Sequence, residues 1–343
     1  MVNRIVALLL LIIPLSLFGQ SYPDSEVHKL IETGITQIEK TKYQEAEQTF
    51  RELDKKYPKL PAGKIFMAAT EIVRCFDLQI PFDEKKISRL IEEATELAET
   101  RIDENPKSAW SHYFMALALS YSAYYDYINR NWFSVLTEGY DALKSFEKCL
   151  EYDKNFYEAT LAIAIFKYWK SKKTEDFHWL PFMSDESQEA LKDISKYSQK
   201  YFYNTGLFIN SVAWIYIDQK DFYKAKSYCD MILQEHPENR IVRWTKARCY
   251  EDIDRTKAIE EFRTLLNMYG GEKAGKVNLV MIKHRIAINY SRLGMHDKAL
   301  ELCNEILAVK NYNAFEKDKL EKRLERVRNL KTESEQKLKS NGK

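Results

Sequence analysis

The sequence predicts an all-α protein, built as a solenoid of about seven helical hairpins and ended by a C-terminal capping helix. Three observations lead to this fold class. Small residues recur in ordered pairs along the chain, large apolar residues follow several pairs at helical spacing, and only 10 Gly and 8 Pro occur among 343 residues. A chain with so few turn-forming residues has little room for a hairpin-rich β fold.

The first hairpin shows the pattern most completely. Gly34 marks a close crossing in a first helix, and Tyr43 opens the second helix. Residues three and four apart lie on one helix face, and the second helix presents such a face with Ala46, Phe50 and Leu53. Pro58 then ends the hairpin, because proline cannot continue a helix.

Seven pairs of small residues predict seven hairpins. A small side chain is needed where two helices cross at about 8–10 Å. The first-helix members are Gly34, Ala68, Ala116, Ala164, Ala213, Ala247 and Ala287. The second-helix members are Ala46, Ala94, Ala142, Ala190, Ala225, Ala258 and Ala299. Large apolar residues stand four positions beyond several second members, as at Phe50, Phe146, Ile194 and Phe262.

This pattern resembles the tetratricopeptide repeat (TPR). Repeat five matches the second-helix positions of that family with Phe222, Ala225, Cys229, Ile232 and Pro237, and repeat seven matches with Tyr290, Gly294, Ala299 and Ile306. The chain departs from the family at Leu30, where the first-helix Trp is expected, and at Lys154, where the terminal Pro is expected. The resemblance spans residues 27–307 and implies a right-handed α-solenoid of TPR-like hairpins with a concave binding side.

Three of the hairpins are predicted to be elongated. The two small residues of a pair are 12 residues apart in repeats one, five and seven and 11 apart in repeat six, but 26 apart in repeats two, three and four. The additional length corresponds to about four α-helical turns, so we expect about two further turns on each helix. The expected second helices are Asp83–Glu104, Asn131–Tyr152 and Asp185–Phe202. In repeat four, Pro181 and its aromatic neighbours predict a loop from Thr174 to Met183.

The first residues predict a secretory signal peptide. Arg4 precedes an apolar run of 14 residues, Ile5–Phe18, interrupted by Pro14. This run is shorter than the ~18–20 residues that span a bilayer. Small residues predict cleavage between Gly19 and Tyr22, no lipoprotein cysteine follows the run, and an uncleaved signal anchor is the alternative. We therefore expect a periplasmic or secreted protein of a Gram-negative bacterium, without a transmembrane span in the mature chain.

Five segments follow from these patterns. Residues 1–21 form the signal peptide, 22–269 the TPR-like repeats one to six, 270–279 a Gly-rich and flexible connection, 280–311 repeat seven, and 312–343 a capping helix with a charged tail. Helical spacing of Leu320, Leu324 and Val327 predicts the capping helix. A coiled-coil dimer is the weaker alternative, because fewer than three heptads are present.

Charge, cysteines and motifs argue against several functions. Lys and Arg number 53 and Asp and Glu 51, so no basic excess predicts nucleic-acid binding. Five cysteines, an odd number without a CxxC, fall inside predicted helices and are expected to be packed thiols: Cys75, Cys149, Cys229, Cys249 and Cys303. The six histidines lack metal-ligand spacing, and phosphate-binding loops and GxSxG are missing. We expect no cofactor, no metal and no catalytic residue.

The resemblance assigns a partner-binding groove to the first helices. Groove-facing positions of the family hold Trp110, Tyr113, Tyr121, Tyr168, Trp169, Asn210, Trp214, Trp244 and Arg248 in this chain. An accessory contact outside the groove is expected from Phe177, Trp179 and Phe182. The alternative for each ring is burial against neighbouring helices.

The sequence thus favours a non-enzymatic scaffold that binds a peptide or protein segment in an aromatic-lined concave groove. A carbohydrate-binding repeat protein is the alternative, because aromatic faces also stack on sugar rings, and an enzyme is the third reading. Acidic and amide side chains beside the rings would favour sugar, whereas Arg and Asn along the first helices favour a peptide. Asn210, Arg243 and Arg248 favour the peptide.

Overall fold

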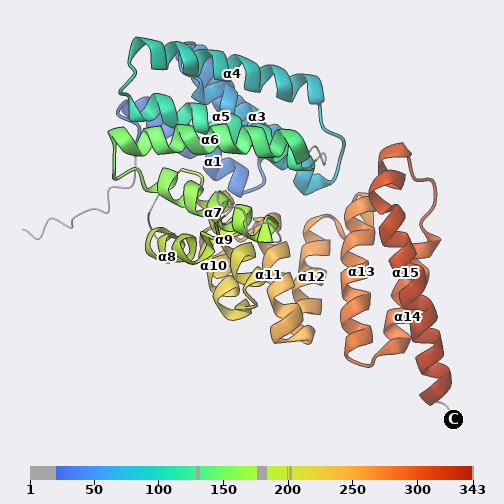
Figure 1. Ribbon diagram of the computed structural model, residues 1–343. Helices are drawn as coiled ribbons and strands as arrows, with labels where there is room; N and C mark the ends of the chain where they lie inside the picture. The colour runs from blue at the N-terminus through green and yellow to red at the C-terminus, as the bar shows by residue number, and fades with distance from the viewer. Residues whose placement is uncertain (1–20, 129–131, 176–183, 199, 201–202, 342–343) are drawn as a thin grey trace, which may run out of the picture.

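The computed structural model describes residues 21–128, 132–175, 184–198, 200 and 203–341, and in this part of the chain it is all-α (Figure 1). Fifteen α-helices and one short 3-10 helix follow one another. They are α1 (Ser25–Glu39), α2 (Tyr43–Lys56), α3 (Ala62–Leu78), α4 (Glu84–Glu104), α5 (Ala109–Ile128), α6 (Trp132–Tyr152), α7 (Tyr157–Lys173), α8 (Ser187–Tyr197), α9 (Thr205–Asp218), α10 (Phe222–Glu235), α11 (Arg240–Ile253), α12 (Arg255–Met268), η2 (Gly271–Lys273), α13 (Lys276–Arg292), α14 (His296–Ala308) and α15 (Ala314–Asn341). The predicted signal peptide, residues 1–21, lies outside the described residues except for Ser21.

Consecutive helices pair into seven hairpins, which confirms the predicted α-solenoid. Odd-numbered helices also contact one another, as between α7 and α9 and between α9 and α11, so they form one layer and the even-numbered helices the other. All fourteen small residues that predicted the hairpins are buried. At Gly34, an added Cβ would lie 2.3 Å from the Phe50 ring, so only glycine allows this crossing.

The elongated hairpins are confirmed in repeats two and three and differ in repeat four. Helices α4, α5 and α6 have 21, 20 and 21 residues, against 15 in α1 and 14 in α2. Asp83 caps α4, accepting from the backbone N–H of Lys86 at 3.1 Å. The prediction of a helix over Asp185–Phe202 is wrong, because α8 has only 11 residues. After α8, the hydroxyl of the buried Ser198 forms a hydrogen bond with that of Tyr228 of α10 at 2.9 Å.

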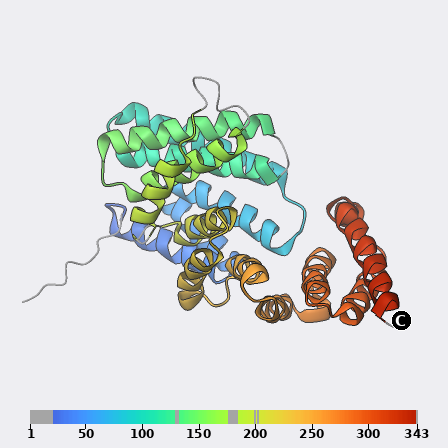
Figure 2. The ribbon, with the colours of Figure 1, turned by 60° about the horizontal axis from the view of Figure 1, so that its bottom comes forward.

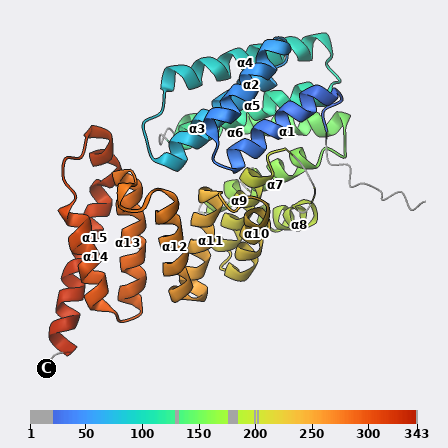
Figure 3. The same cartoon turned by 180° about the vertical axis from the view of Figure 1, so that it is seen from behind.

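The C-terminal helices extend as an arm from the rest of the molecule (Figures 1 and 3). Gly270 and Gly271 adopt positive φ values of 97° and 60° around η2, which explains the glycines in the connection. Helix α13 begins at Lys276, within the segment expected to be the connection. The capping helix α15 buries Leu320 and Val327, and its charged end stays helical to Asn341 instead of forming a tail.

Helices far apart in sequence meet where the solenoid closes on itself. Figure 2 shows α1 and α2 beside the helices α9 to α11. Asp77, at the end of α3, accepts from the Tyr43 hydroxyl at 2.9 Å, from the Tyr269 hydroxyl at 2.6 Å, and from the Arg240 guanidinium. Its backbone carbonyl accepts from the Asn278 amide at 3.0 Å. We call these five residues the closure junction, because they join α2 and α3 to α11, α12 and α13.

Two further carboxylates are buried where distant helices meet. Glu39 ends α1 and accepts from the Asn239 amide, and an added Cβ at Gly206 would clash with its carboxylate. Glu158, in the first turn of α7, accepts from the Tyr113 hydroxyl and the Asn204 amide, both at 2.6 Å. Burial raises the pKa of Glu39 and of Glu158 to about 7, although these hydrogen bonds oppose the shift.

The five cysteines are free and buried, as the sequence predicted. Burial raises the pKa of Cys75 to about 12, so its thiol stays protonated at neutral pH. The cysteines therefore serve packing.

Candidate functional site

Three of the predicted groove rings belong to the core, which corrects the prediction for them. Tyr113 and Tyr168 are fully buried and Tyr121 is 6% exposed. Asn204, directly before α9, contacts the inner face of α5, and α9 packs against α7. Tyr121 donates to the Asn204 amide oxygen at 2.9 Å, and Tyr168 donates to Asp218 at 2.5 Å. A ring in this position has no face left for a partner.

Three predicted tryptophans are partly exposed and packed against hydrophobic clusters. Trp110 lies against Phe156 with a ring separation of 4.9 Å, and Tyr22 covers it at 5.1 Å. Trp244 meets the Phe262 ring edge-to-face at 5.4 Å. Trp169 lies beside Tyr168 at 5.3 Å. These rings contribute to folding, and each offers a partner only part of its surface.

Trp214 is the predicted tryptophan that the hydrophobic clusters of the described residues leave out. It lies on α9, is partly exposed, and has the Arg248 guanidinium of α11 at 6.0 Å from its ring centre. This distance is within the range of a cation–π contact. The neighbouring Asn210 accepts from the Thr245 hydroxyl at 2.7 Å and so joins α9 to α11. Trp214 and Arg248 thus meet on adjacent odd-numbered helices, and their role in a groove stays a prediction.

A cluster of arginines continues from Trp214 toward the C-terminus. The carboxylate of Glu251, which is buried, pairs with the Nε of Arg248 at 2.8 Å and with the Arg285 guanidinium of α13. The Asn289 amide donates to the same carboxylate at 2.9 Å. Glu251 therefore joins α11 to α13.

The terminal helix adds a third arginine to this cluster. Arg323 of α15 lies 3.4 Å from the Nδ1 of the buried His284 of α13. We call Arg248, Glu251, Arg285 and Arg323 the arginine cluster. It draws on α11, α13 and α15, and it adjoins Trp214 on α9.

Burial and mutual repulsion disfavour positive charge in this cluster. The pKa of Arg285 falls to about 10, because burial and the nearby Arg248 outweigh the attraction of Glu251. The pKa of Arg323 is lowered by burial, Arg326 and Arg248. The pKa of His284 falls to about 3 through burial and the nearby arginines, so this imidazole is neutral and can accept from Arg323.

Sequence reasoning missed Glu251, Arg285, Asn289 and Arg323. The repeat pattern assigns groove positions along a single helix and contains no information on which charges meet across helices. A signal was nevertheless present. Arg285 and Asn289 stand four residues apart in α13 and therefore share one helix face. Charged residues are rarely buried without a partner.

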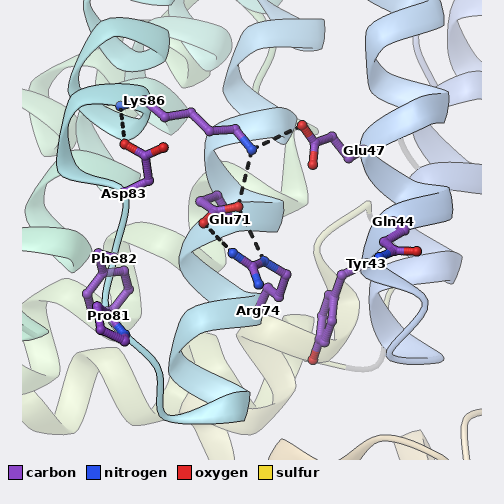
Figure 4. A pocket seen from close by; sticks show the side chains of 9 residues that line it. All are labelled: Tyr43, Gln44, Glu47, Glu71, Arg74, Pro81, Phe82, Asp83 and Lys86. Carbon is purple, nitrogen blue, oxygen red and sulfur yellow. Dashed lines mark hydrogen bonds and ion pairs between the residues drawn. The ribbon is translucent and has the colours of Figure 1, made fainter. Parts of the chain in front are cut away.

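A second polar site lies between α2, α3 and α4 in a pocket of about 410 Å³ (Figure 4). Lys86 reaches Glu47 at 3.0 Å and Glu71 at 3.2 Å, and Arg74 pairs with Glu71 at 2.6 Å. The charges that line the pocket therefore compensate one another and hold the start of α4 against α2 and α3.

The accessory contact predicted for Phe177, Trp179 and Phe182 lies outside the described residues. In the part of the chain that the structure describes, no group of three or more His, Cys, Asp or Glu side chains could hold a metal ion. No helix within the same residues has the length and apolar character to cross a bilayer.

Comparison of the chain with family models and with known proteins shows which proteins it resembles. The tetratricopeptide repeat model matches residues 30–59. No curated protein matches the chain. Among solved structures, YrrB, described as a TPR protein with an unusual peptide-binding site, is 14% identical over 65% of this chain and 96% of that chain, with a TM-score of 0.44.

Two further structures show the same level of similarity. The C-terminal part of a TPR repeat-containing protein from Cytophaga hutchinsonii is 16% identical over 86% of this chain and 98% of its own, with a TM-score of 0.42. A Rap protein complexed with competence and sporulation factor is 16% identical over 92% of this chain and 88% of its own, with a TM-score of 0.47. The described helices thus form an all-α solenoid of seven helical hairpins, and its residues 30–59 match the tetratricopeptide repeat.

Proposed function

We propose that the chain is a non-enzymatic periplasmic scaffold that binds a peptide or protein segment over α9, α11 and α13. The observation that carries this proposal is Trp214, a partly exposed ring that the hydrophobic clusters do not use and that lies beside Arg248. Aromatic and arginine side chains are the residue types that dominate binding energy at protein interfaces.

The surroundings of Trp214 favour a peptide over a sugar. The ring is followed along the solenoid by the guanidinium groups of Arg248 and Arg285 and by the Asn289 amide. Two carboxylates of the described residues lie near these groups, and both have partners: Glu251 is buried and paired with arginines, and Asp218, one turn along α9 from Trp214, accepts from the Tyr168 hydroxyl. A sugar site needs free carboxylate and amide groups for its hydroxyls, whereas guanidinium groups suit carbonyl and carboxylate oxygens.

The periplasmic location rests on the first residues of the sequence. The short apolar run Ile5–Phe18 after Arg4 supports export, and cleavage near Tyr22 supports release from the membrane. Amino-terminal sequencing of the protein from the envelope fraction tests this part of the proposal. We expect a start near Tyr22, and recovery of Met1 would contradict it.

The binding proposal is tested with Trp214→Ala and with Trp244→Ala as the matched control. The partner is first identified by capture from the envelope fraction and mass spectrometry, and its affinity is then measured with purified proteins. We expect Trp214→Ala to weaken binding by roughly thirtyfold, as for an anchor that contributes about 2 kcal/mol. Its melting temperature should stay close to that of the wild type.

Trp244→Ala should behave differently, because its ring packs against Phe262. Removing a packed tryptophan lowers the free energy of unfolding by about 3–5 kcal/mol. If Trp214→Ala binds the identified partner as tightly as the wild type, or if it melts as early as Trp244→Ala, the ring is not an anchor and the proposal fails.

A further inference from the structure

We infer that Cys229 of α10 and Cys249 of α11 form a disulfide bond in the mature protein. In the structure both thiols are free and buried, where the fifth and sixth hairpins meet. The inference rests on the proposed function in one respect, because the periplasm is a compartment in which disulfides form and persist. The bond itself depends on the folded chain, so it can also be tested with the purified protein.

The first argument is that the two thiols meet across packed helices. A side-chain hydrogen bond joins Cys229 to Cys249. Both side chains are 0% exposed, and both belong to one hydrophobic cluster. A disulfide requires two cysteines whose side chains point toward each other over a short distance. The contact between the thiols provides this orientation.

The second argument is that polar contacts of α10 and α11 hold the pair in place. Lys246 of α11 pairs with Asp230 of α10 at 3.0 Å. One turn away, the Lys226 ammonium of α10 lies 5.6 Å from the centre of the Tyr250 ring of α11. The two cysteines directly precede Asp230 and Tyr250 in the sequence. The thiols are therefore bracketed by contacts that fix one helix against the other.

The remaining cysteines have different surroundings. The Cys75 thiol contacts the Glu71 carboxylate at 3.3 Å and the Pro81 carbonyl at 3.4 Å. Burial raises the pKa of Cys149, and it raises the pKa of Cys303 to about 11. Among the described residues, no second cysteine contributes to either shift. One pairing is therefore favoured over all others.

The reaction is a thiol–disulfide exchange with an oxidant that itself carries a disulfide, such as an oxidised thiol oxidoreductase or glutathione disulfide. The thiolate of one cysteine attacks a sulfur of the oxidant, which forms a mixed disulfide and releases one thiol. The thiolate of the second cysteine then attacks the protein sulfur of the mixed disulfide and releases the second thiol. Two protons and two electrons thus pass to the oxidant, which leaves as two thiols.

Burial determines when this exchange takes place. The hydrogen bond with Cys249 and burial raise the pKa of Cys229 well above its ordinary value, so the folded chain holds little of the reactive thiolate. The exchange therefore occurs while the exported chain folds, when both thiols are still accessible. Once the helices pack, the same burial protects the bond from reductants.

The bond would fix the step between two successive hairpins. Helix α10 ends the fifth hairpin and α11 begins the sixth, and Arg248 directly precedes Cys249. The link therefore also holds the α11 backbone beside Trp214 of α9. A disulfide lowers the conformational entropy of the unfolded chain, so the oxidised protein should melt at a higher temperature than the reduced protein.

The test counts free thiols in the mature protein after refolding in a mixture of glutathione and glutathione disulfide. The protein is quenched with acid, denatured and labelled with a maleimide, and mass spectrometry counts the labels. We expect three labelled cysteines, because two of the five are bonded, and five labels after reduction. Peptide mapping should place the bond between Cys229 and Cys249. Five labels before reduction would overturn the inference, as would a bond between any other pair.

Cys229→Ser is the test variant and Cys303→Ser the matched control, because each replaces one buried thiol. All four remaining cysteines should be labelled in Cys229→Ser, but two of the four in Cys303→Ser. Oxidation should raise the melting temperature of the wild type and of Cys303→Ser by about 5 °C and leave that of Cys229→Ser unchanged. The same response in both variants would contradict the inference, and the labelling of the wild type decides even if a variant fails to fold.

Failure of the bond is distinguishable from failure of the proposed function. A chain that begins near Tyr22 but keeps five free thiols after refolding would reject the bond and leave the periplasmic location standing. A chain recovered with Met1 that forms the bond in glutathione would reject the location and leave the bond standing. Partner capture by Trp214→Ala tests the scaffold independently of both.

Discussion

The closure junction and the arginine cluster are both places where the solenoid buries charge, but they balance that charge differently. At the closure junction the buried Asp77 carboxylate receives Arg240 and two tyrosine hydroxyls, from three other helices. In the arginine cluster the Glu251 carboxylate pairs with two guanidinium groups, and the third, of Arg323, lies against the neutral His284. A buried charge that is fully paired joins helices, whereas one without a carboxylate partner contributes less to joining them.

The largest effect is expected from Asp77→Ala at the closure junction. Arg240 would remain buried without a carboxylate, and breaking such a pair lowers the free energy of unfolding by about 3–5 kcal/mol. Urea denaturation measures this change. Asp83→Ala is the control, because it removes an exposed helix cap and should lower stability by only about 1 kcal/mol. Equal losses for the two variants would show that the junction does not hold the closed solenoid.

The next effect concerns the pH dependence of the buried carboxylates Glu39 and Glu158. Their pKa is about 7 in the folded chain, above that of an unfolded Glu. The folded state therefore binds the additional protons, so their stabilisation is complete at low pH and is lost as pH rises through about 7. As the pH rises from 5 to 7, deprotonation of each carboxyl should lower the free energy of unfolding by about 2 kcal/mol. Glu39→Gln and Glu158→Gln should each reduce the change of the unfolding free energy with pH, measured by urea denaturation at several pH values. The same pH dependence in a variant and in the wild type would contradict the prediction.

Glu251→Gln tests the one carboxylate of the arginine cluster. Its loss removes the charged hydrogen bond from Arg285 and the ion pair with Arg248, and should lower the free energy of unfolding by about 1.5–3 kcal/mol. Glu305→Gln, which removes the exposed partner of Lys283 in the same region, is the control and should change stability little. Differential scanning calorimetry compares the two. A Glu251→Gln protein as stable as the control would mean that the arginines do not depend on this carboxylate.

The smallest effect on stability is expected from Arg323→Gln. Because burial and neighbouring arginines already disfavour its charge, removing it should change the free energy of unfolding by no more than about 0.5 kcal/mol. Arg240→Gln, the same substitution at the closure junction, should be strongly destabilising, because it leaves Asp77 buried and unpaired. The comparison of the two variants in urea separates an arginine without an ion pair among the described residues from one that pairs with a buried carboxylate. A large loss for Arg323→Gln would place that residue with the structural group.

The candidate site was predictable only in part. Trp214, Asn210 and Arg248 follow from repeat positions on α9 and α11, because those helices keep the ordinary hairpin length. The same positions fail in the elongated hairpins, where Tyr113, Tyr121 and Tyr168 are buried. In those hairpins the inner face is covered by residues such as Asn204, which the chain brings back after the short helix α8.

The sequence by itself determined the local architecture of this protein. Small residues at helix crossings, as at Gly34 against Phe50, and apolar spacing along each helix are local constraints, so hairpin number and most helix bounds follow from them. Only the tertiary structure decided where the solenoid closes and which charges meet. Asp77 lies 163 residues before Arg240, and Arg323 lies 39 residues after His284. Such contacts depend on the summed rotation of successive hairpins, which no single repeat encodes.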